Sequence, residues 1–241
     1  MQDILFNMQL FYLPDLSKEH KIADFSKDES KHIYKVLRKK KGDDIDITNG
    51  KNILFKGIIS SISKNNCQVS IKDVVEKNPL PYSLHVGISL LKSNERFEWF
   101  LEKASEIGIT EITPLICDRT EKKFINENRF KKILVSSMKQ SLKLHLPKLN
   151  SVSNLKDFIE IQNKEKLFIA HCNDSKKNLL IKLIKPKSSS LILIGPEGDF
   201  TDKEVENCNN KKYQNVSLGD TRLRAETAGI VACHTFSIAN M

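Results

Sequence analysis

Two loops carry the residues whose types and spacing could bind or convert a ligand. The first, Gly195-Pro196-Glu197-Gly198, follows four consecutive aliphatic residues, 191–194, which predict a strand buried on both faces. Thr201-Asp-Lys-Glu204 then predicts a helix start, because Thr-x-x-Glu is the capping-box pattern. Strand, glycine loop and helix start together predict a concave site lined by backbone N–H groups, where open α/β sheets bind ligands. By itself this stretch fits a tight turn without a ligand equally well.

A second loop of the same kind lies between residues 218 and 228. It begins with Gly219, carries Arg222, Arg224 and Glu226, and leads into a stretch of small residues that predicts a packed helix. Two such loops could bracket one ligand. The nucleotide-binding patterns G-x-G-x-x-G and G-x-x-x-x-G-K-[ST] are absent, and the first loop has no lysine to meet a phosphate. A dinucleotide or nucleoside triphosphate is therefore a poor candidate.

The elements before these loops divide into two regions. Residues 1–76 are predicted to form a small β-barrel or sandwich, because apolar residues alternate with polar ones from residue 45 to 71 and Asn49-Gly50 is a strong hairpin signal. A strand at 8–13 and a helix at 28–39 precede this pattern, with Gly42 expected as the C-cap. The basic run 38–41 is either a solvated helix end or an edge that contacts phosphates.

Two prolines within residues 77–81 predict a linker, and the pattern changes after it. Residues 82–241 are predicted to form an α/β domain whose parallel sheet is covered on both faces, because strands and helices alternate. The expected strands are 83–91, 111–117, 167–170, 191–194 and 216–218, and the expected helices are 95–107, 129–143, 178–184 and 225–238.

The composition favours a polyanionic partner. The 241 residues include 39 Lys and Arg against 30 Asp and Glu, which gives a net charge of +9. Such an excess attracts nucleic acids, although a lysine-rich composition can also reflect an AT-rich genome. The first residues lack a signal-peptide pattern, and no apolar run is long enough to span a bilayer, so we expect a cytoplasmic protein without a membrane partner. Met1 and Met8 are alternative start residues.

A metal site is not expected. The five cysteines are scattered, without a C-x-x-C pair, and the six histidines show no ligand spacing. The cysteines are therefore expected to be reduced and mostly buried.

At the two loops a resemblance becomes specific. Ile194-Gly-Pro-Glu-Gly198 and Leu218-Gly-x-x-x-Leu-Arg-x-Glu-Thr-Ala228 resemble the signature loops of the ribosomal RNA small subunit methyltransferase E (RsmE) family. These SPOUT-class enzymes methylate N3 of uracil 1498 in 16S rRNA. The resemblance covers nearly the whole chain, since further blocks match at Val36-Leu37-Arg38, at 101–108, at Thr113-Pro114-Leu115 and at Gln140-Ser141.

The resemblance implies a fold and partners that periodicity does not reveal. Residues 1–76 would be a PUA-like RNA-binding β-barrel, and residues 82–241 a SPOUT domain with a deep trefoil knot. S-adenosylmethionine (SAM) would be the cofactor, 16S rRNA in the small subunit the substrate, and the enzyme a homodimer. A SPOUT enzyme acting on another RNA such as tRNA, or a non-catalytic RNA-binding protein, is the alternative.

The resemblance also implies roles for particular residues. Arg224 would hold a phosphate or stabilise charge that develops on the uracil, and Glu226 would orient Arg224 or accept a proton. A plain acid at a helix start is an equally good interpretation of Glu226. The cofactor would be held at Ala170, His171, Ile194, Gly195, Glu197, Gly198, Leu218, Gly219, Leu223 and Ala228. RNA would be contacted by Arg38, Lys39, Arg119, Lys139, Lys143 and Arg222.

Several positions depart from the family pattern. Asp199 stands where the family usually has a glycine, and Thr221 where an arginine is common, with Arg222 replacing the aliphatic residue after it. Lys139 and Lys143 replace a usual Glu and Arg, and lysine does not reproduce a bidentate arginine contact.

Overall fold

The computed structural model describes residues 9–173 and 176–241, and the chain divides into two compact units. One comprises Met1–Pro79 with Met138–Leu146, and the other Leu80–Ser137 with Pro147–Met241. The first division, between Pro79 and Leu80, falls inside the predicted linker. The alternative starts Met1 and Met8 lie outside the described residues.

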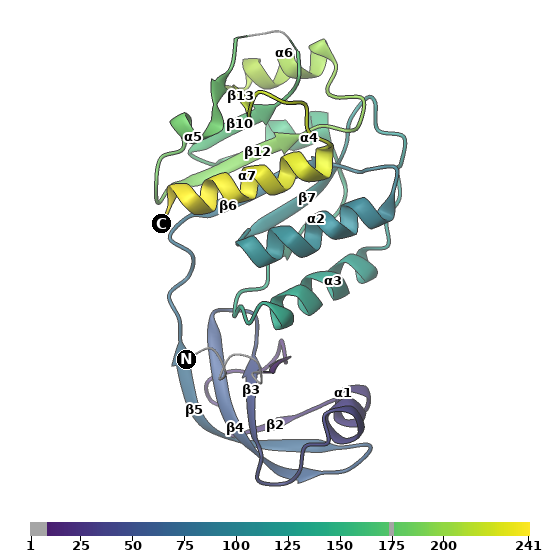
Figure 1. Ribbon diagram of the computed structural model, residues 1–241, viewed down its shortest axis with the longest axis vertical. Coiled ribbons are helices and arrows are strands. Elements are labelled where there is room, and N and C mark those ends of the chain that lie inside the picture. Colours follow the sequence, from purple (N-terminus) through teal and green to yellow (C-terminus); the bar gives the residue numbers. More distant parts are fainter. Residues whose placement is uncertain (1–8, 174–175) are drawn as a thin grey trace. The chain divides into compact units, whose positions relative to one another are not determined.

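The N-terminal unit contains a five-stranded sheet of order β1-β3-β4-β5-β2, curled into a half-barrel (Figure 1). Its strands are β1 (Leu10–Tyr12), β2 (Ile22–Asp24), β3 (Asp44–Thr48), β4 (Ile53–Ile62) and β5 (Cys67–Glu76). The hairpins predicted around residues 49–50 and 65–66 join β3 to β4 and β4 to β5. Alternation puts every second side chain inside, so Ile47, Phe55 and Val69 are among the fully buried core residues.

The helix predicted at 28–39 is wrong in its second half. Helix α1 (Lys27–Lys31) continues as a π-helix, η2 (His32–Val36), closed by a hydrogen bond from the Leu37 N–H to the His32 carbonyl at 3.1 Å. The wider turn keeps Ile33 fully buried in the half-barrel core. Gly42 is therefore not the C-cap; its φ of 97° serves the turn into β3.

Residues 138–146 belong to the N-terminal unit by their contacts, although the sequence assigns them to the second domain. The Leu146 N–H donates to the Gly50 carbonyl and the Asn52 N–H donates to the Leu144 carbonyl, both at 2.9 Å. A side chain at Gly50 would meet the Leu146 Cβ at 2.9 Å, so glycine permits this approach as well as the positive φ. The β3–β4 turn thus receives a segment distant in sequence.

The C-terminal unit contains a parallel sheet, as predicted, but with eight strands where the sequence indicated five. Its order is β11-β13-β10-β12-β6-β7-β8, with β9 also paired to β7. The strands are β6 (Ser83–Ser89), β7 (Glu111–Ile116), β8 (Lys148–Leu149), β9 (Ser153–Asn154), β10 (Lys166–Ala170), β11 (Asn178–Leu179), β12 (Ser189–Ile194) and β13 (Gln214–Ser217). The helices are α2 (Asn94–Ile107), α3 (Glu127–Gln140), α4 (Leu155–Glu160), α5 (Leu180–Leu183), α6 (Asp202–Asn210) and α7 (Ala225–Ala239), and α3 ends in the N-terminal unit.

Helices cover both faces of this sheet (Figure 1). On one face Leu191 and Leu193 of β12 pack with Phe158 of α4 and Val205 of α6. On the other, α7 lies beside α2, and a Cβ at Gly229 would meet the Phe100 ring at 2.6 Å. The small residues of α7 therefore serve an approach to α2 of the same chain.

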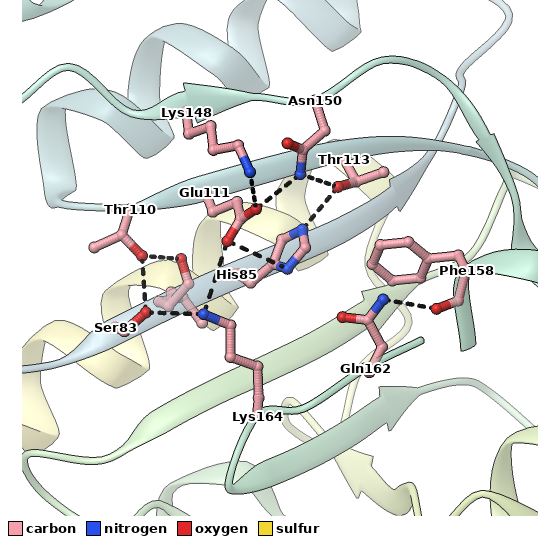
Figure 2. Close-up of polar contacts among 11 residues, drawn as sticks. Ser83, His85, Thr110, Glu111, Thr113, Lys148, Asn150, Phe158, Gln162 and Lys164 are labelled. Atoms are coloured by element: carbon pink, nitrogen blue, oxygen red, sulfur yellow. Dashed lines mark hydrogen bonds and ion pairs between the residues drawn. The ribbon is translucent and has the colours of Figure 1, made fainter. Parts of the chain in front are cut away.

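A polar cluster lies at the amino ends of β6 and β7 (Figure 2). His85 is 3% exposed; its Nε2 lies 2.7 Å from the Thr113 hydroxyl, and its Nδ1 lies 3.7 Å from the Glu111 carboxylate. Lys148 and Lys164 pair with the same carboxylate at 3.1 and 3.7 Å. Burial lowers the pKa of His85 to about 4, so the imidazole is neutral at pH 7.

None of the helices in the described residues combines the length and apolar character that a membrane span requires. All five cysteines are free, and only Cys172 is exposed. Residues 9–173 and 176–241 contain no group of three or more His, Cys, Asp or Glu side chains placed to hold a metal ion.

Candidate functional site

A pocket of about 760 Å³ opens at the carboxyl ends of β10, β12 and β13. These strands are neighbours in the sheet and parallel, so their ends at Ala170, Ile194 and Ser217 meet at one edge. The lining residues are Ala170, His171, Cys172, Lys177, Ile194, Gly195, Pro196, Glu197, Asp199, Val216, Ser217, Leu218, Gly219, Asp220, Thr221, Arg222, Leu223, Arg224, Ala225 and Ala228. Both loops singled out in the sequence therefore face one cavity, of the size that holds a small-molecule ligand.

The loop after β12 is held tightly. A side chain at Gly195 would come within 3.2 Å of the Phe200 ring and backbone nitrogen. The predicted capping box is present at α6, because Glu204 N–H donates to Thr201 Oγ1 at 3.3 Å and Thr201 N–H donates to Glu204 Oε2 at 2.8 Å. Glu204 also accepts from the Asp118 N–H at 2.8 Å. This wall of the pocket is preorganised by the helix start that follows it.

Asp199 occupies the left-handed region, with φ 64°. Aspartate is one of the few side chains that tolerate this conformation, which fits a position where the resemblance leads us to expect a glycine. Its Oδ1 accepts from the Phe200 N–H at 2.8 Å, and its Oδ2 accepts from the Cys172 N–H at 2.7 Å. The substitution therefore adds a link between the loops after β10 and β12.

Two further contacts fix the glycine loop. Glu197 Oε1 accepts a hydrogen bond from the Lys92 N–H at 3.0 Å. Arg119 Nη1 donates to the Gly198 carbonyl at 2.7 Å, and a Cβ at Gly198 would meet the Arg119 side chain at 3.3 Å. Gly198 does not line the pocket. The side chain of Arg119, a predicted RNA contact, packs against Gly198.

His171 presents the buried polar group of the cavity. It is 7% exposed, and neither ring nitrogen has a hydrogen-bond partner among the described residues. Burial lowers its pKa, with Asn215 beside it acting in the opposite direction, so the ring is neutral at pH 7. Lys177 Nζ donates to the His171 carbonyl at 2.9 Å. Both ring nitrogens are buried, so His171 forms part of the pocket wall and presents no exposed hydrogen-bonding group there.

The loop after β13 brings two arginines to the cavity. Gly219 has φ 146°, and Ser217 Oγ donates to the Gly219 carbonyl at 2.7 Å, which fixes the start of the loop. Arg222 and Arg224 both line the pocket, and Arg224 is the N-cap residue of α7. The Arg224 carbonyl accepts from the Ala228 N–H at 2.8 Å, which ties the arginine to the helix start.

Glu226 does not line the pocket, although it was predicted together with Arg224. It is buried in the first turn of α7, with Oε1 at 3.8 Å from Arg96 Nε and Oε2 without a hydrogen-bond partner among the described residues. No described hydrogen bond joins it to Arg224. The geometry supports a role in holding the start of α7.

The other predicted RNA contacts lie in the N-terminal unit. Arg38 is exposed, whereas the Lys39 ammonium donates to the Asp44 carbonyl at 2.9 Å. The Lys139 ammonium pairs with Glu29 at 2.7 Å and lies 5.5 Å from the Phe11 ring centroid, which is a structural arrangement. Burial lowers the pKa of Lys143. Their roles in RNA binding stay predictions.

Several lining residues were missed. Pro196, Thr221 and Asp220 sit within the two recognised loops, so the loop pattern carried their signal. Cys172 and Lys177 belong to the connection after β10, where the sequence shows only the end of a strand. Nothing in their residue types marks them.

The comparisons place this architecture in a known class. Residues 78–237 match the family model of an RNA methyltransferase domain, and residues 25–72 match that of an RNA methyltransferase PUA domain. A half-barrel followed by a parallel α/β unit with a pocket at its strand ends thus defines an RNA methyltransferase.

Similar proteins narrow the class. The chain is 32% identical to a ribosomal RNA small subunit methyltransferase E of Buchnera aphidicola, over 86% of this chain and 85% of that protein. A probable rRNA methyltransferase from Porphyromonas gingivalis has a TM-score of 0.87 and 33% identity, over 96% of this chain and 99% of that one. A putative methyltransferase from Legionella pneumophila, in complex with SAM, also has a TM-score of 0.87, with 26% identity over 97% and 98% of the two chains. The chain belongs to the ribosomal RNA small subunit methyltransferase E family.

Proposed function

We propose that this protein transfers a methyl group from SAM to N3 of a single uridine, uracil 1498, in the 16S rRNA of the small ribosomal subunit. The observation that carries the proposal is the cavity in which Arg224 lies among the glycine loops of β12 and β13. The Legionella relative has SAM bound, and the present cavity suits such a ligand. Its volume falls in the range of small-molecule sites.

The charges on the loop after β12 fit a sulfonium ligand better than a phosphate. The loop after β12 contributes Glu197 and Asp199 and no lysine. Gly195 lets Phe200 pack closely against this loop, because a Cβ at position 195 would lie 3.1 Å from the Phe200 ring. Residues at the ends of β10, β12 and β13 would hold the cofactor: Ala170, His171, Ile194, Gly195, Glu197, Leu218, Gly219, Leu223 and Ala228.

The residues of the chain then have distinct tasks. SAM supplies an electrophilic methyl group when bound. N3 of neutral uracil carries a proton and lacks an available lone pair, so this proton must be lost to water, and the site must favour the resulting N3 anion. The Arg224 guanidinium stabilises this negative charge, because an always-charged donor in a partly closed cavity lowers the energy of a developing anion. Glu226 fixes the start of α7 and, with it, the Arg224 backbone.

The substrate implies further properties. A target base within folded RNA must be turned out of its stack to reach a cavity of this kind. Basic residues such as Arg38 would contact phosphates without reading sequence. We also propose a cytoplasmic homodimer and a trefoil-knotted chain around the cofactor, as in the family the sequence resembles.

Methyl transfer with purified components tests the function. The protein is incubated with [methyl-³H]SAM and small subunits from cells lacking the modification, and the nucleosides are then separated. Label should appear in N3-methyluridine of 16S rRNA. Label in tRNA instead would identify another RNA substrate, and a protein that binds no SAM by calorimetry would be a non-catalytic RNA-binding protein. Either result contradicts the proposal.

A further inference from the structure

Residues 31–41 of the N-terminal unit, here called the basic turn, form the most concentrated run of positive charge in the sequence. They contain six Lys and Arg residues and His32, with no Asp or Glu. Two apolar side chains in the middle of this run are exposed: Tyr34 at 45% and Val36 at 66%. An exposed aromatic ring flanked by cations is suited to a ligand with both planar and anionic parts.

The backbone holds these side chains in place. Tyr34 and Val36 lie on the π-helix η2, a conformation that is rare and often found at functional sites. Arg38 follows with φ 54°, a region that non-glycine residues seldom occupy. Below them, Ile33 is fully buried and the Lys39 N–H donates to the Ile33 carbonyl at 3.2 Å. The exposure of Tyr34 is therefore set by the packing of Ile33.

Most of the charge in the basic turn remains available. Lys39 is held by the Asp44 carbonyl, as described above. The side chains of Lys35, Arg38, Lys40 and Lys41 are exposed, and none forms an ion pair within the described part of the chain. The nearby Asp43 carboxylate accepts a hydrogen bond from the backbone N–H of Lys40 at 2.8 Å and forms no ion pair with these side chains among the described residues.

We propose that the basic turn is a docking surface for an unpaired RNA nucleotide, whose base stacks on Tyr34 and contacts Val36 while Lys35 and Arg38 meet the adjoining phosphates. Base stacking on an aromatic ring tolerates any sequence, and cations beside the ring supply backbone attraction. A duplex keeps its base faces covered and would use the cations alone. Two exposed apolar side chains offer little area for insertion into a membrane. The proposal rests on the proposed function only in taking RNA as the partner.

Binding by the full-length protein tests it, without SAM. Fluorescein-labelled single-stranded RNA and a blunt RNA duplex are titrated with wild type, Tyr34→Ala, Tyr34→Phe and Val36→Ala. Ile161→Ala, at an apolar residue 78% exposed in the C-terminal unit, is the matched control. Tyr34→Ala should weaken single-strand binding about tenfold, which lies within the range that stacking on one ring contributes, and leave duplex binding unchanged. Tyr34→Phe and Ile161→Ala should stay within about twofold of wild type.

The cations should behave differently. Arg38→Ala should weaken single-strand and duplex binding alike and reduce the dependence on salt, because it removes a phosphate contact. An unchanged melting temperature for Tyr34→Ala is expected, since its ring is exposed. Equal single-strand binding by Tyr34→Ala and wild type, or an equal loss on duplex, would overturn the proposal. So would vesicles of phosphatidylglycerol that bind wild type and lose Tyr34→Ala while RNA binding persists.

SAM affinity and methyl transfer by wild type are measured in parallel. A protein that binds no SAM yet loses single-strand binding through Tyr34→Ala would contradict the proposed function and support the docking surface. If wild type methylates rRNA but Tyr34→Ala binds RNA as well as wild type does, the result would support the proposed function and contradict the docking surface.

Discussion

Asp199 Oδ2 accepts a hydrogen bond from the backbone N–H of Cys172 at 2.7 Å, across 27 positions of sequence. The same carboxylate accepts from the Phe200 N–H at 2.8 Å. Two strand-end loops that line the cavity are thereby joined by one side chain, at a position where a glycine is usual in the family that the sequence resembles. The aspartate compensates for its left-handed backbone with contacts that glycine lacks.

Asp199→Gly tests this link. Glycine keeps the backbone conformation but removes both hydrogen bonds, so we expect weaker SAM binding by about tenfold and a loss of stability of about 1–3 kcal/mol. Asp199→Asn, which retains one acceptor oxygen and tolerates the same φ, should fall between. Calorimetry gives the affinity and urea unfolding the stability. Unchanged values for the glycine variant would show that the link contributes nothing.

Arg224 and Gly195 should separate chemistry from cofactor binding. Arg224→Ala is expected to lower kcat by about 10²–10³ with SAM affinity retained, because it removes charge stabilisation from the transition state. Gly195→Val is expected to abolish SAM binding, since its side chain would collide with Phe200. Single-turnover methylation and calorimetry measure the two effects. Equal loss of SAM affinity in both variants would disprove the division of roles.

His85 should make stability depend on pH. Its pKa is about 4 when folded, against about 6.5 unfolded, so the unfolded state binds the proton first as the pH falls. Stability from this group is therefore complete above pH 6.5 and declines towards pH 4, by about 3 kcal/mol in total. His85→Gln can keep a bond to Thr113 without titrating. The difference between the two urea-unfolding profiles should follow this window, and parallel profiles would argue against it.

Glu111 contributes in a lower pH range. Burial acts to raise its pKa, but Asn150, His85 and Lys148 together lower it. Its stabilising effect is lost as the pH falls below 4.5, and His85→Gln changes this loss because His85 contributes to the Glu111 shift. The comparison with His85→Gln therefore isolates the imidazole only above about pH 4.5.

Gly229→Ala sets helix propensity against packing. Propensity alone predicts a gain of about 1 kcal/mol in a helix interior. The new Cβ would lie 2.6 Å from the Phe100 ring, so overpacking between α7 and α2 should instead destabilise the protein by about 1–3 kcal/mol. Adding Phe100→Leu should restore part of the loss. A single variant more stable than wild type would show that α7 shifts at no cost.

The sequence predicts well wherever a pattern is local. Residues 191–204 combine an aliphatic run, glycines and a capping box, and the structure has strand, loop and helix there in this order. Prediction from the sequence fails where contacts between residues distant in sequence determine the local structure. The π-helix at His32–Val36 depends on burying Ile33, and residues 138–146 pair with the turn at Gly50. No local sequence pattern predicts the π-helix or the pairing of residues 138–146 with this turn.

The residues of the candidate site likewise divide into those that a local pattern predicts and those that it does not. The two glycine loops carried their own signals, so the pocket's two main walls were predicted from the sequence. Cys172 and Lys177 were missed because they join the cavity only through the parallel pairing of β10 with β12 and β13. Glu226 was paired with Arg224 through the resemblance, but its position in the first helical turn directs it towards Arg96.

Mapping of cellular rRNA tests the proposed activity most directly. 16S rRNA from a strain lacking this gene is digested and analysed by mass spectrometry, beside strains restored with wild type or with Arg224→Ala. We predict that one N3-methyluridine disappears in the deletion strain, returns with wild type and stays absent with the variant. Full methylation in the deletion strain, where no second copy of the gene exists, would contradict the assignment.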